Sequence, residues 1–580
     1  MPFLTLTPHE VVSKQLPPTP RLGYPVPSHR HAVSVQLPTW DDMRGMVAQE
    51  PRVSRVQQIG YPRSFLNQDI VKVNNACLAL HRHEGEKCLV FPALDHAASC
   101  EAAIIDKAPE ATERVRIRAA DFLLDDSLMK NATTTTGFQV SNNAPRRFYI
   151  VFYPAEANVA AMGFWRLSGT GISSRLAQSM LKHLDNIHWV SGSVLLRTDA
   201  GISRSLTDPQ SDDTIRSRIV ELLQRGSISA AQSAKFGPSD VFLYPTGMAA
   251  IYATNALLQS WQASQTVVFG FPYELTLKLV QQYGVNAKFY GFGTPTELDE
   301  FESYLDAELR EGRTIQSVWC ECASNPLLRT VDLERIRHLA DMYGFVIVVD
   351  ETIGSFANVD VAGVADIIVT SLTKSFSGRA NVMGGSVVLN PSSPWYAPLK
   401  KSLEKTYVNE LFGADSRVLE YNSRDFLSVA ATMNRNAQHI VSLLSPIAGT
   451  SSSTLSRVYY PSTCWSRTNY EARMRKVSPG FTSGYGGLFT LEFDSVEAAS
   501  TFFDTLNVHK GPSLGAHVTL AQPYVQTVFS REKEWAASYG LKASIVRISV
   551  GLENENALGH EFMRALRVAD QSKAGSESDA

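Results

Sequence analysis

The amino-acid sequence predicts an α/β fold with a mostly parallel sheet, and two observations support this prediction. Between residues 240 and 390, short apolar runs alternate with longer amphipathic stretches; the runs are DVFLYP, TVVFGF, AKFYGFG, SVWCEC, FVIVVD, DIIVTSL and GSVVLN. Such an alternation is typical of a parallel sheet covered by helices on both faces. Polar residues follow several of the runs directly, and ligands of parallel sheets bind at the carboxyl ends of the strands. We therefore expect a ligand site along that edge.

Length and composition favour a globular protein of several domains. The chain has 580 residues, more than a single hydrophobic core usually supports. Hydrophobic residues make up 44% and charged residues 19%, and the net charge of −3 gives no electrostatic reason to expect a nucleic-acid partner. No apolar run approaches the ~18 residues of a membrane span. The first residues, MPFLTLTPHE, lack the features of a signal peptide, so we expect a cytoplasmic protein with no membrane partner.

Shifts in composition divide the chain into five segments. Residues 1–60 are rich in proline and polar residues and predict an extended N-terminal arm. Residues 61–190 contain enough apolar material for an N-terminal α/β extension domain, whose role the sequence leaves open. The alternating pattern belongs to a large domain over residues 191–400, which is followed by a smaller C-terminal α/β domain over 401–570. Residues 571–580, QSKAGSESDA, have the composition of a disordered tail.

The cysteines and histidines predict no metal site. The six cysteines are sparse and follow no zinc-binding spacing, so structural thiols are the simpler interpretation. His81 and His83 could bind a metal together, but no further ligands stand at a suitable spacing, which favours a solvated loop.

A lysine follows the apolar run at residues 367–369, at the start of a glycine-rich turn. The segment after the run reads TSLTKSFSG, which places Lys374 next to hydroxyl-bearing residues, Ser371 and Thr373 among them. An amine past the carboxyl end of a parallel strand can form a Schiff base, and the hydroxyls can donate to a phosphate. Taken alone, the pattern also fits a surface lysine in a polar loop.

A carboxylate ends the apolar run before that lysine. Asp350 closes FVIVVD, and the interval to Lys374 leaves room for a loop and one further strand. A permanent anion suits the protonated ring nitrogen of pyridoxal phosphate, which must stay charged to accept electrons. An aspartate that simply terminates a strand is the alternative interpretation.

A third pattern predicts a phosphate-binding turn. The strand DVFLYP runs into Thr246-Gly247-Met248, where the helical run MAAIYATNALLQSW begins. Glycine lets the backbone approach an anion, and a helix N-terminus presents free N–H groups and the positive end of the helix dipole. The turn is neither a Walker A nor a GxGxxG motif. The order of phosphate turn, aspartate and lysine along the chain argues against coincidence.

These motifs resemble the Cys/Met-metabolism (trans-sulfuration) branch of fold-type I pyridoxal-phosphate enzymes, which have an aminotransferase-like fold. The family's Ser/Thr-Gly-Met, Tyr-x-x-Thr, Glu-x-x-x-Asn-Pro, Asp-x-Thr and Ser-x-Thr-Lys are present in order, over about residues 200–570. FPYELTLK, NSRDF, GPSLG and WAASYG, with HAVSVQLPTWDD and GYPRSF near the N-terminus, are more similar to the fungal cystathionine gamma-synthase group than to the bacterial type. The resemblance implies pyridoxal 5′-phosphate as cofactor.

The resemblance also implies roles for individual residues. Lys374 would carry the cofactor and move protons, Tyr273 would lie over its ring as a second acid/base, and Asp350 would anchor its ring nitrogen. The other implied cofactor contacts are Thr246, Gly247, Met248, Asn325, Thr352, Ser371 and Thr373. Arg547 in VRISVGLE and Ser513 in GPSLG are the implied substrate-binding residues.

One position departs from the family pattern. The family's Tyr-x-Arg, which reaches the cofactor phosphate of a neighbouring subunit, is matched here to Ile202-Ser203-Arg204, so its tyrosine is missing. Arg204 can still supply a guanidinium fork to the phosphate, or it is an ordinary surface arginine. The resemblance implies a homodimer or homotetramer with sites completed across the interface.

The implied reaction is a γ-replacement in methionine biosynthesis. An activated homoserine ester, O-acetyl- or O-succinylhomoserine, would react with cysteine to give cystathionine. The residues do not fix the nucleophile: another thiol, sulfide or a carbon nucleophile in a specialised biosynthetic pathway would use the same early steps, and elimination would make the protein a γ-lyase. A protein that binds the cofactor without turnover is the alternative from a different class.

Overall fold

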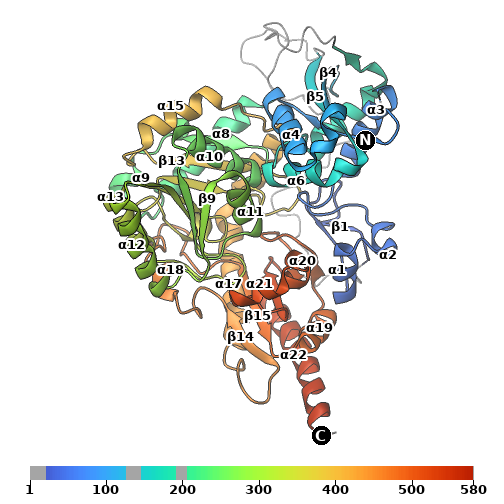
Figure 1. Cartoon of the computed structure of the whole chain (residues 1–580). Coiled ribbons are helices and arrows are strands. Elements are labelled where there is room, and N and C mark those ends of the chain that lie inside the picture. The colour runs from blue at the N-terminus through green and yellow to red at the C-terminus, as the bar shows by residue number, and fades with distance from the viewer. Residues whose placement is uncertain (1–20, 82, 126–144, 191–205, 579–580) are drawn as a thin grey trace.

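The computed structural model describes residues 21–81, 83–125, 145–190 and 206–578. These residues form a four-stranded N-terminal sheet, a seven-stranded central sheet, a five-stranded C-terminal sheet and a two-stranded hairpin. In Figure 1 the N-terminal domain lies at the top, the large domain at the left and the C-terminal domain at the bottom. None of the helices within the described ranges is both long and apolar enough to cross a membrane.

The large domain contains the predicted alternation of strands and helices. Its elements are α8 (Pro209–Gln224), α9 (Ala230–Ser233), β7 (Val241–Tyr244), α10 (Gly247–Trp261), β8 (Gln265–Phe269), α11 (Glu274–Tyr283), β9 (Val285–Tyr290), α12 (Pro295–Arg310), β10 (Ile315–Glu321), α13 (Leu333–Tyr343), β11 (Val346–Asp350), α14 (Ser355–Asn358), β12 (Ile367–Thr370), β13 (Gly385–Leu389) and α15 (Tyr396–Thr406). The strand order is β7-β13-β12-β11-β10-β8-β9, and only β13 runs antiparallel to its neighbours. The predicted α/β fold with a mostly parallel sheet is confirmed.

Alternating side chains on each strand explain why the sheet is covered on both faces. On β7, Phe242 and Tyr244 pack with α10, α11 and α15, while Val241 and Leu243 pack with α8, α12 and α13. A strand buried on both sides reads as a continuous apolar run, because successive side chains point to opposite faces. This packing leaves the carboxyl ends of the parallel strands open to the other two domains.

The C-terminal domain covers that open edge. Its elements are α16 (Gly413–Asn422), α17 (Phe426–Leu444), β14 (Leu455–Tyr459), α18 (Arg467–Glu471), β15 (Leu488–Phe493), α19 (Val496–Thr505), β16 (His509–Lys510), β17 (Leu520–Gln522), α20 (Tyr524–Val528), α21 (Lys533–Ser538), β18 (Ile545–Ser549) and α22 (Glu555–Ser578). The sheet order is β14-β15-β18-β17-β16. Helix α22 continues past residue 571, where we expected order to end; a helix that is already nucleated by packing extends at little cost.

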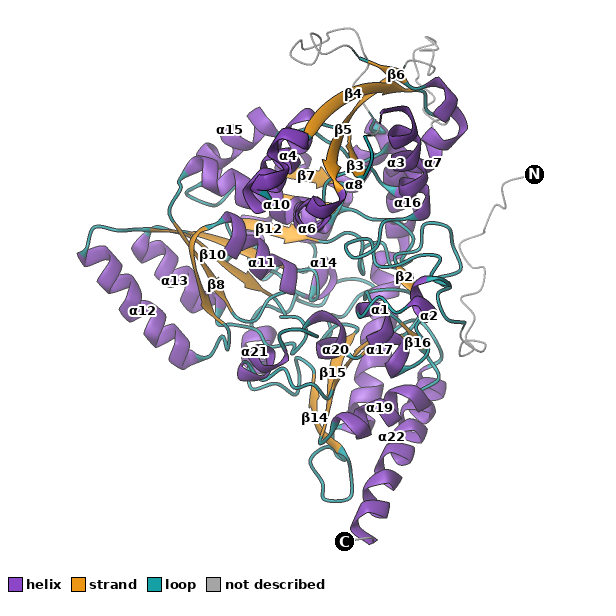
Figure 2. Ribbon diagram, turned by 45° about the vertical axis from the view of Figure 1, so that its right-hand side comes forward, coloured by secondary structure: helices purple, strands orange, loops and turns teal. Residues whose placement is uncertain are grey.

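The N-terminal domain is a sheet with two helices on each face. Its elements are α3 (Gln68–His81), β3 (Glu86–Phe91), α4 (Leu94–Lys107), β4 (Arg116–Phe122), β5 (Arg146–Pro154), α6 (Asn158–Ser168), α7 (Ser174–Met180) and β6 (His188–Trp189). The strands pair antiparallel in the order β3-β5-β4-β6. Helix α6 also packs against α10 of the large domain, and Figure 2 shows the two helices side by side.

The N-terminal arm lies between the N-terminal and C-terminal domains. Its described part contains β1 (Pro25–Val26), β2 (Ser34–Val35), α1 (Trp40–Val47) and α2 (Pro51–Ser54). Trp40 packs edge-on against Phe503, with 5.9 Å between ring centroids, and its backbone N–H donates to Asp504 at 2.7 Å. The chain then runs from α2 toward the carboxyl edge of the central sheet, where residues 61–65 line a cavity.

His31 fixes the arm to α7 of the N-terminal domain and gives the protein a pH dependence of stability. Its Nδ1 lies 2.8 Å from the Ser174 hydroxyl and its Nε2 lies 2.8 Å from Gln178 Oε1. Burial, with the nearby charge of Arg175, lowers the pKa of His31 to about 3, whereas an unfolded histidine titrates near ~6.5. Between these two pKa values the histidine is protonated in the unfolded state but neutral in the folded state. The free energy of unfolding therefore falls as the pH falls below ~6.5, by at most about 1.4 kcal/mol per pH unit.

We therefore expect His31→Gln to flatten the pH dependence of thermal unfolding on the acid side of neutrality. Glutamine keeps polar contacts to Ser174 and Gln178 but does not titrate. Thermal unfolding followed at several values between pH 5 and pH 7, at fixed cofactor concentration, measures the effect. His338→Gln, at an exposed histidine, is the matched control. An unchanged slope in His31→Gln would contradict the assignment.

Candidate active site

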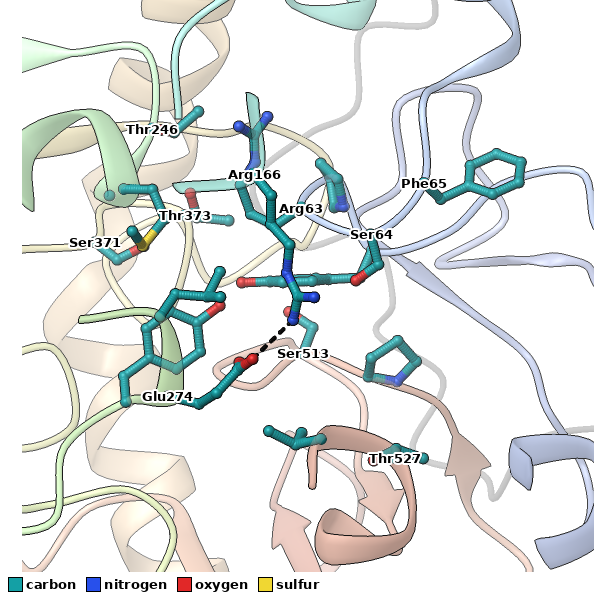
Figure 3. A pocket seen from close by; sticks show the side chains of 18 of the residues that line it. Arg63, Ser64, Phe65, Arg166, Thr246, Glu274, Ser371, Thr373, Ser513 and Thr527 are labelled. Atoms are coloured by element: carbon teal, nitrogen blue, oxygen red, sulfur yellow. Dashed lines mark hydrogen bonds and ion pairs between the residues drawn. The ribbon is translucent and has the colours of Figure 1, made fainter. Parts of the chain in front are cut away.

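A cavity of about 950 Å³ opens where the three domains and the arm meet, at the carboxyl edge of the central sheet. It is lined by every site residue that the sequence predicted within the described ranges: Thr246, Gly247, Met248, Tyr273, Asn325, Asp350, Thr352, Ser371, Thr373, Lys374, Ser513 and Arg547. Arg204 lies outside the described residues. Figure 3 shows part of the cavity from close by. The parallel strands bring together residues that are far apart in the sequence.

Lys374 stands in the turn after β12 and is buried in this cavity. Its Nζ donates to the Tyr61 hydroxyl at 3.2 Å and to the Ser513 hydroxyl at 3.2 Å. Ser513 has φ of 100°, a conformation that costs a non-glycine residue about 1–3 kcal/mol. This backbone conformation aims the Ser513 hydroxyl at Lys374 while its carbonyl accepts a hydrogen bond from Arg547 at 3.0 Å. The strained serine therefore connects the lysine with the arginine.

The N-terminus of α10 forms the turn that the sequence assigned to a phosphate. Thr246 caps the helix by accepting from the Ala249 N–H at 2.9 Å, and its hydroxyl donates to the Gly169 carbonyl at 2.9 Å. A Cβ at Gly247 would stand 2.6 Å from the Ser371 Cβ, so only glycine allows this close approach. The first N–H groups of a helix have no acceptor within the helix. Gly247 and Met248 thus offer backbone donors beside the Ser371 side chain.

Asp350 and Thr352 connect the ends of β11 and β12. The Asp350 carboxylate accepts from the Thr352 N–H at 2.9 Å, and the Thr352 hydroxyl accepts from the Ser371 N–H at 2.8 Å. Removal from water raises the pKa of Asp350. No cation pairs with this carboxylate within the described ranges, so a positively charged group bound here would restore its preference for the ionised form.

Glu321 holds two of the predicted residues in place. Its carboxylate accepts from the Tyr273 N–H at 2.6 Å and from the Asn325 N–H at 3.0 Å. Burial, and then the neighbouring Asp350 charge, raise the pKa of Glu321. The glutamate lines the cavity as well and fixes the backbone positions of Tyr273 and Asn325.

Arg547 on β18 is a buried guanidinium whose hydrogen-bond partners are neutral. It donates to Asn325 Oδ1 at 3.1 Å and to Gln522 Oε1 at 2.6 Å, besides the Ser513 carbonyl. Burial lowers the pKa of Arg547. Within the described ranges no carboxylate pairs with it, and burial of an uncompensated charge costs several kcal/mol. An anionic ligand group beside Arg547 would offset that cost.

The sequence analysis missed Tyr61 and Arg63, which lie where the arm continues past residue 60 and before α3 begins at Gln68. Arg63 is buried; it donates to the Trp165 carbonyl at 3.0 Å, and its guanidinium lies 4.3 Å from the Trp165 ring centroid. Burial lowers the pKa of Arg63 to about 10, and its Nε has no hydrogen-bond partner among the described residues. GYPRSF contains the Tyr-x-Arg spacing that we matched instead to residues 202–204, and this spacing was the available signal.

The unpaired charges of the cavity fit pyridoxal phosphate and an amino acid. Arg63 and the N-terminus of α10 can hold a phosphate, Asp350 can hold a protonated ring nitrogen, and Arg547 can hold a carboxylate. Lys374 lies among them and supplies the amine. The seven-stranded sheet with this site at its carboxyl edge defines a fold-type I pyridoxal-phosphate enzyme.

Comparison with known families places the chain within that class. Residues 227–567 match the family of Cys/Met metabolism PLP-dependent enzymes. Residues 69–173 match the N-terminal domain of fungal trans-sulfuration enzymes. The chain belongs to the Cys/Met metabolism family of PLP-dependent enzymes, with pyridoxal phosphate as its cofactor.

Curated relatives and solved structures agree with this assignment. The chain is 36% identical to alanine racemase ungC of Aspergillus violaceofuscus, over 92% of this chain and 94% of the relative. It is 33% identical to cystathionine gamma-synthase of Neurospora crassa, over 95% and 98%. The structure of cystathionine gamma-synthase from Xanthomonas oryzae pv. oryzae shares the fold with a TM-score of 0.51 and 21% identity, over 64% of this chain and 90% of that chain.

Proposed function

We propose that the protein catalyses a γ-replacement on an activated homoserine ester, O-acetyl- or O-succinylhomoserine, with cysteine as the acceptor and cystathionine as the product. The observation that carries this proposal is the contact of Lys374 with Tyr61 and Ser513. The same cavity is lined by two buried guanidiniums, of Arg63 and Arg547, that lack a carboxylate partner in the described structure. The bound cofactor would withdraw electrons from the substrate carbons. The residues of the chain would bind and orient the substrate and transfer protons to and from it.

Arg547 would bind the α-carboxylate of the donor and so set the orientation of its Cα–H bond toward Lys374. The Ser513 hydroxyl holds the lysine amine at 3.2 Å, which limits where that amine can accept the proton. A bidentate guanidinium–carboxylate pair supplies direction as well as affinity. Lys374 is then the base at Cα and the donor of the same proton at a later step.

Tyr61 and Tyr273 would divide the second acid/base role between them. Burial acts to raise the pKa of Tyr61, but the charge of Lys374 and hydrogen bonds with Tyr273 and Lys374 outweigh it and lower that pKa. Burial and the neighbouring Tyr61 raise the pKa of Tyr273. Tyr61 is thus the better proton acceptor near Lys374, whereas Tyr273 stays protonated and can donate to a leaving group.

Tyr61 and Arg63 would also take the place that the sequence analysis gave to residues 202–204. They reach the cavity from the arm of the same chain, which packs along the C-terminal domain. We propose that each subunit of a homodimer or homotetramer completes its own cofactor site with this pair.

Product analysis of the purified, cofactor-loaded protein tests the reaction. O-acetylhomoserine and O-succinylhomoserine are each supplied with and without cysteine, and amino acids and ketoacids are quantified. We expect cystathionine only when donor and cysteine are both present. Ketobutyrate alone would show a γ-lyase, and donor consumption that requires sulfide, another thiol or a carbon nucleophile would show a specialised biosynthetic enzyme. No turnover with any combination would contradict γ-replacement.

Racemisation of a small amino acid is a second candidate activity, because the relative with 36% identity is named an alanine racemase. Racemisation removes the Cα proton from one face and returns a proton to the opposite face, and Lys374 with the Tyr61 hydroxyl at 3.2 Å would supply the acid/base groups. Incubation of L-alanine with the protein in heavy water would then yield deuterated D-alanine. Deuterium in L-alanine alone, or none, would exclude this activity.

A further inference from the structure

Helix α6 of the N-terminal domain forms one wall of the active-site cavity. Val159, Met162, Gly163 and Arg166 all line it. Their spacing of three and four residues places them on one face of the helix. The first three are apolar, and Arg166 lies at the end of the row. The N-terminal domain therefore contributes a surface to the site, with a charged residue at one point of that surface.

Arg166 pairs with Glu274, the first residue of α11, which packs against α6. The guanidinium Nη2 lies 2.9 Å from Glu274 Oε1, as the dashed line in Figure 3 marks. The Arg166 side chain is 42% exposed and that of Glu274 is 3% exposed. Glu274 directly follows Tyr273 in the chain, so this pair lies close to the proposed acid/base groups. A partly exposed cation thus faces the space that a ligand would fill.

The ion pair is built so that Arg166 can exchange partners. Lys278, one turn further along α11, donates to Glu532 at 2.8 Å and also places its Nζ 3.5 Å from the same Glu274 carboxylate. If Arg166 moves to another anion, Glu274 keeps a cation and avoids the cost of an isolated buried charge. Arg166 Nε has no hydrogen-bond partner among the described residues, so the guanidinium has a donor left for a ligand.

We propose that Arg166 binds a second carboxylate, at the end of an amino-acid ligand that lies away from Arg547. The proposal rests on the proposed function, because it requires an amino acid held at Lys374 and Arg547. The carboxylate has two possible sources in that reaction: the acceptor amino acid, or the succinyl group of the donor. The apolar row on α6 would contact the carbon chain between the two charged ends.

Binding of two amino acids that differ in one distal carboxylate tests this role. L-2-aminoadipate carries the carboxylate and L-norleucine, of the same chain length, does not; binding of each is followed through the visible absorption of the cofactor-loaded protein. We expect the wild-type protein to bind 2-aminoadipate more tightly than norleucine. Arg166→Ala should reduce this difference in affinity about tenfold, by weakening the binding of 2-aminoadipate while leaving that of norleucine unchanged. Arg114→Ala, which breaks an exposed ion pair with Glu156 in the same domain, is the matched control.

Glu274→Gln separates ligand binding from a structural role of the ion pair. If Arg166 binds a ligand carboxylate, removal of its competitor should leave the preference for 2-aminoadipate unchanged or increase it. If the ion pair only holds α6 against α11, both Glu274→Gln and Arg166→Ala should weaken the binding of 2-aminoadipate and norleucine to the same extent, and the inference would be wrong. A wild-type protein that binds neither amino acid, or both equally, would overturn this inference alone, whereas no turnover of either homoserine ester would overturn the proposed function.

Two comparisons identify the source of the carboxylate. Arg166→Ala should raise the KM for O-succinylhomoserine but not for O-acetylhomoserine if the leaving group is bound. It should instead erase the preference for cysteine over cysteamine, which lacks a carboxylate, if the acceptor is bound. No change of either kind would contradict the proposed role.

Gly163 offers a test of the wall that does not touch the ion pair. A Cβ built at Gly163 meets no atom within 4 Å, so a larger side chain would extend into the cavity without displacing the protein. We expect Gly163→Leu to weaken the binding of 2-aminoadipate and of norleucine alike. Gly163→Ala should bind both amino acids as the wild type does, and it should be slightly more stable because alanine favours a helix more than glycine. If Gly163→Leu binds both amino acids as the wild type does, α6 does not contact the ligand.

Discussion

Lys374→Ala should reduce turnover by at least about 10³-fold, because the variant loses both the amine that attaches the cofactor and the proposed base at Cα. Among the described residues, the Lys374 Nζ donates to the hydroxyls of Tyr61 and Ser513. Its removal leaves no carboxylate without its partner, so we expect the variant to fold. Steady-state kinetics with donor and cysteine measures the loss.

A chemical readout separates loss of attachment from loss of folding. Borohydride reduction of the wild-type protein, followed by peptide mass spectrometry, should find the cofactor mass on the peptide that contains Lys374. Lys374→Arg keeps a positive charge beside Tyr61 but cannot form the imine, and it should therefore be as inactive as Lys374→Ala. Substantial turnover in either variant, or labelling of another lysine in the wild type, would contradict the assignment.

The sequence was sufficient for the large domain because its signals are local. Asp350 is the last residue of a buried strand, and Thr246 and Lys374 follow within a few residues of the ends of two others. Parallel strands place their carboxyl ends at one edge, so the order of motifs along the chain also predicts their proximity in space. These patterns predicted seven of the lining residues, and the family resemblance implied the other five: the first set is Thr246, Gly247, Met248, Asp350, Ser371, Thr373 and Lys374, and the second is Tyr273, Asn325, Thr352, Ser513 and Arg547.

Tyr61 and Arg63 could not be placed by the same reasoning. More than 300 residues separate Tyr61 from Lys374 in the chain, and no strand end adjoins it. Its position depends on how the arm packs, with Trp40 against Phe503 and His31 against α7. Arg166 carries no motif at all, since it is one residue of an amphipathic helix whose exposed face is known only once α6 is docked. Such positions follow from tertiary packing, which a single sequence does not reveal.

Arg63→Ala should weaken cofactor retention about 10- to 100-fold, the effect expected when a charge-assisted contact to a phosphate is removed. Arg63 is buried on the Trp165 ring and has no ion-pair partner within the described ranges, so a cofactor phosphate is the anion that we assign to it. Equilibrium dialysis against graded pyridoxal phosphate measures the change. Arg63→Lys, which retains a charge without the planar fork, should fall between the wild type and Arg63→Ala. Unchanged retention in Arg63→Ala would contradict this role.

Mixed oligomers decide whether the arm serves its own chain or a neighbour. Lys374→Ala and Arg63→Ala subunits are co-expressed with different tags, and the mixed species is purified. If Arg63 completes the site of its own chain, every site in the mixture carries one defect, and activity should stay at the level of the single variants. If it completes a neighbour's site, one of the two sites of each mixed dimer is intact, and the purified mixed dimer should recover about half of wild-type activity. Such a recovery would show that Arg63 contacts the cofactor of a neighbouring subunit, the role that the resemblance implied for Arg204.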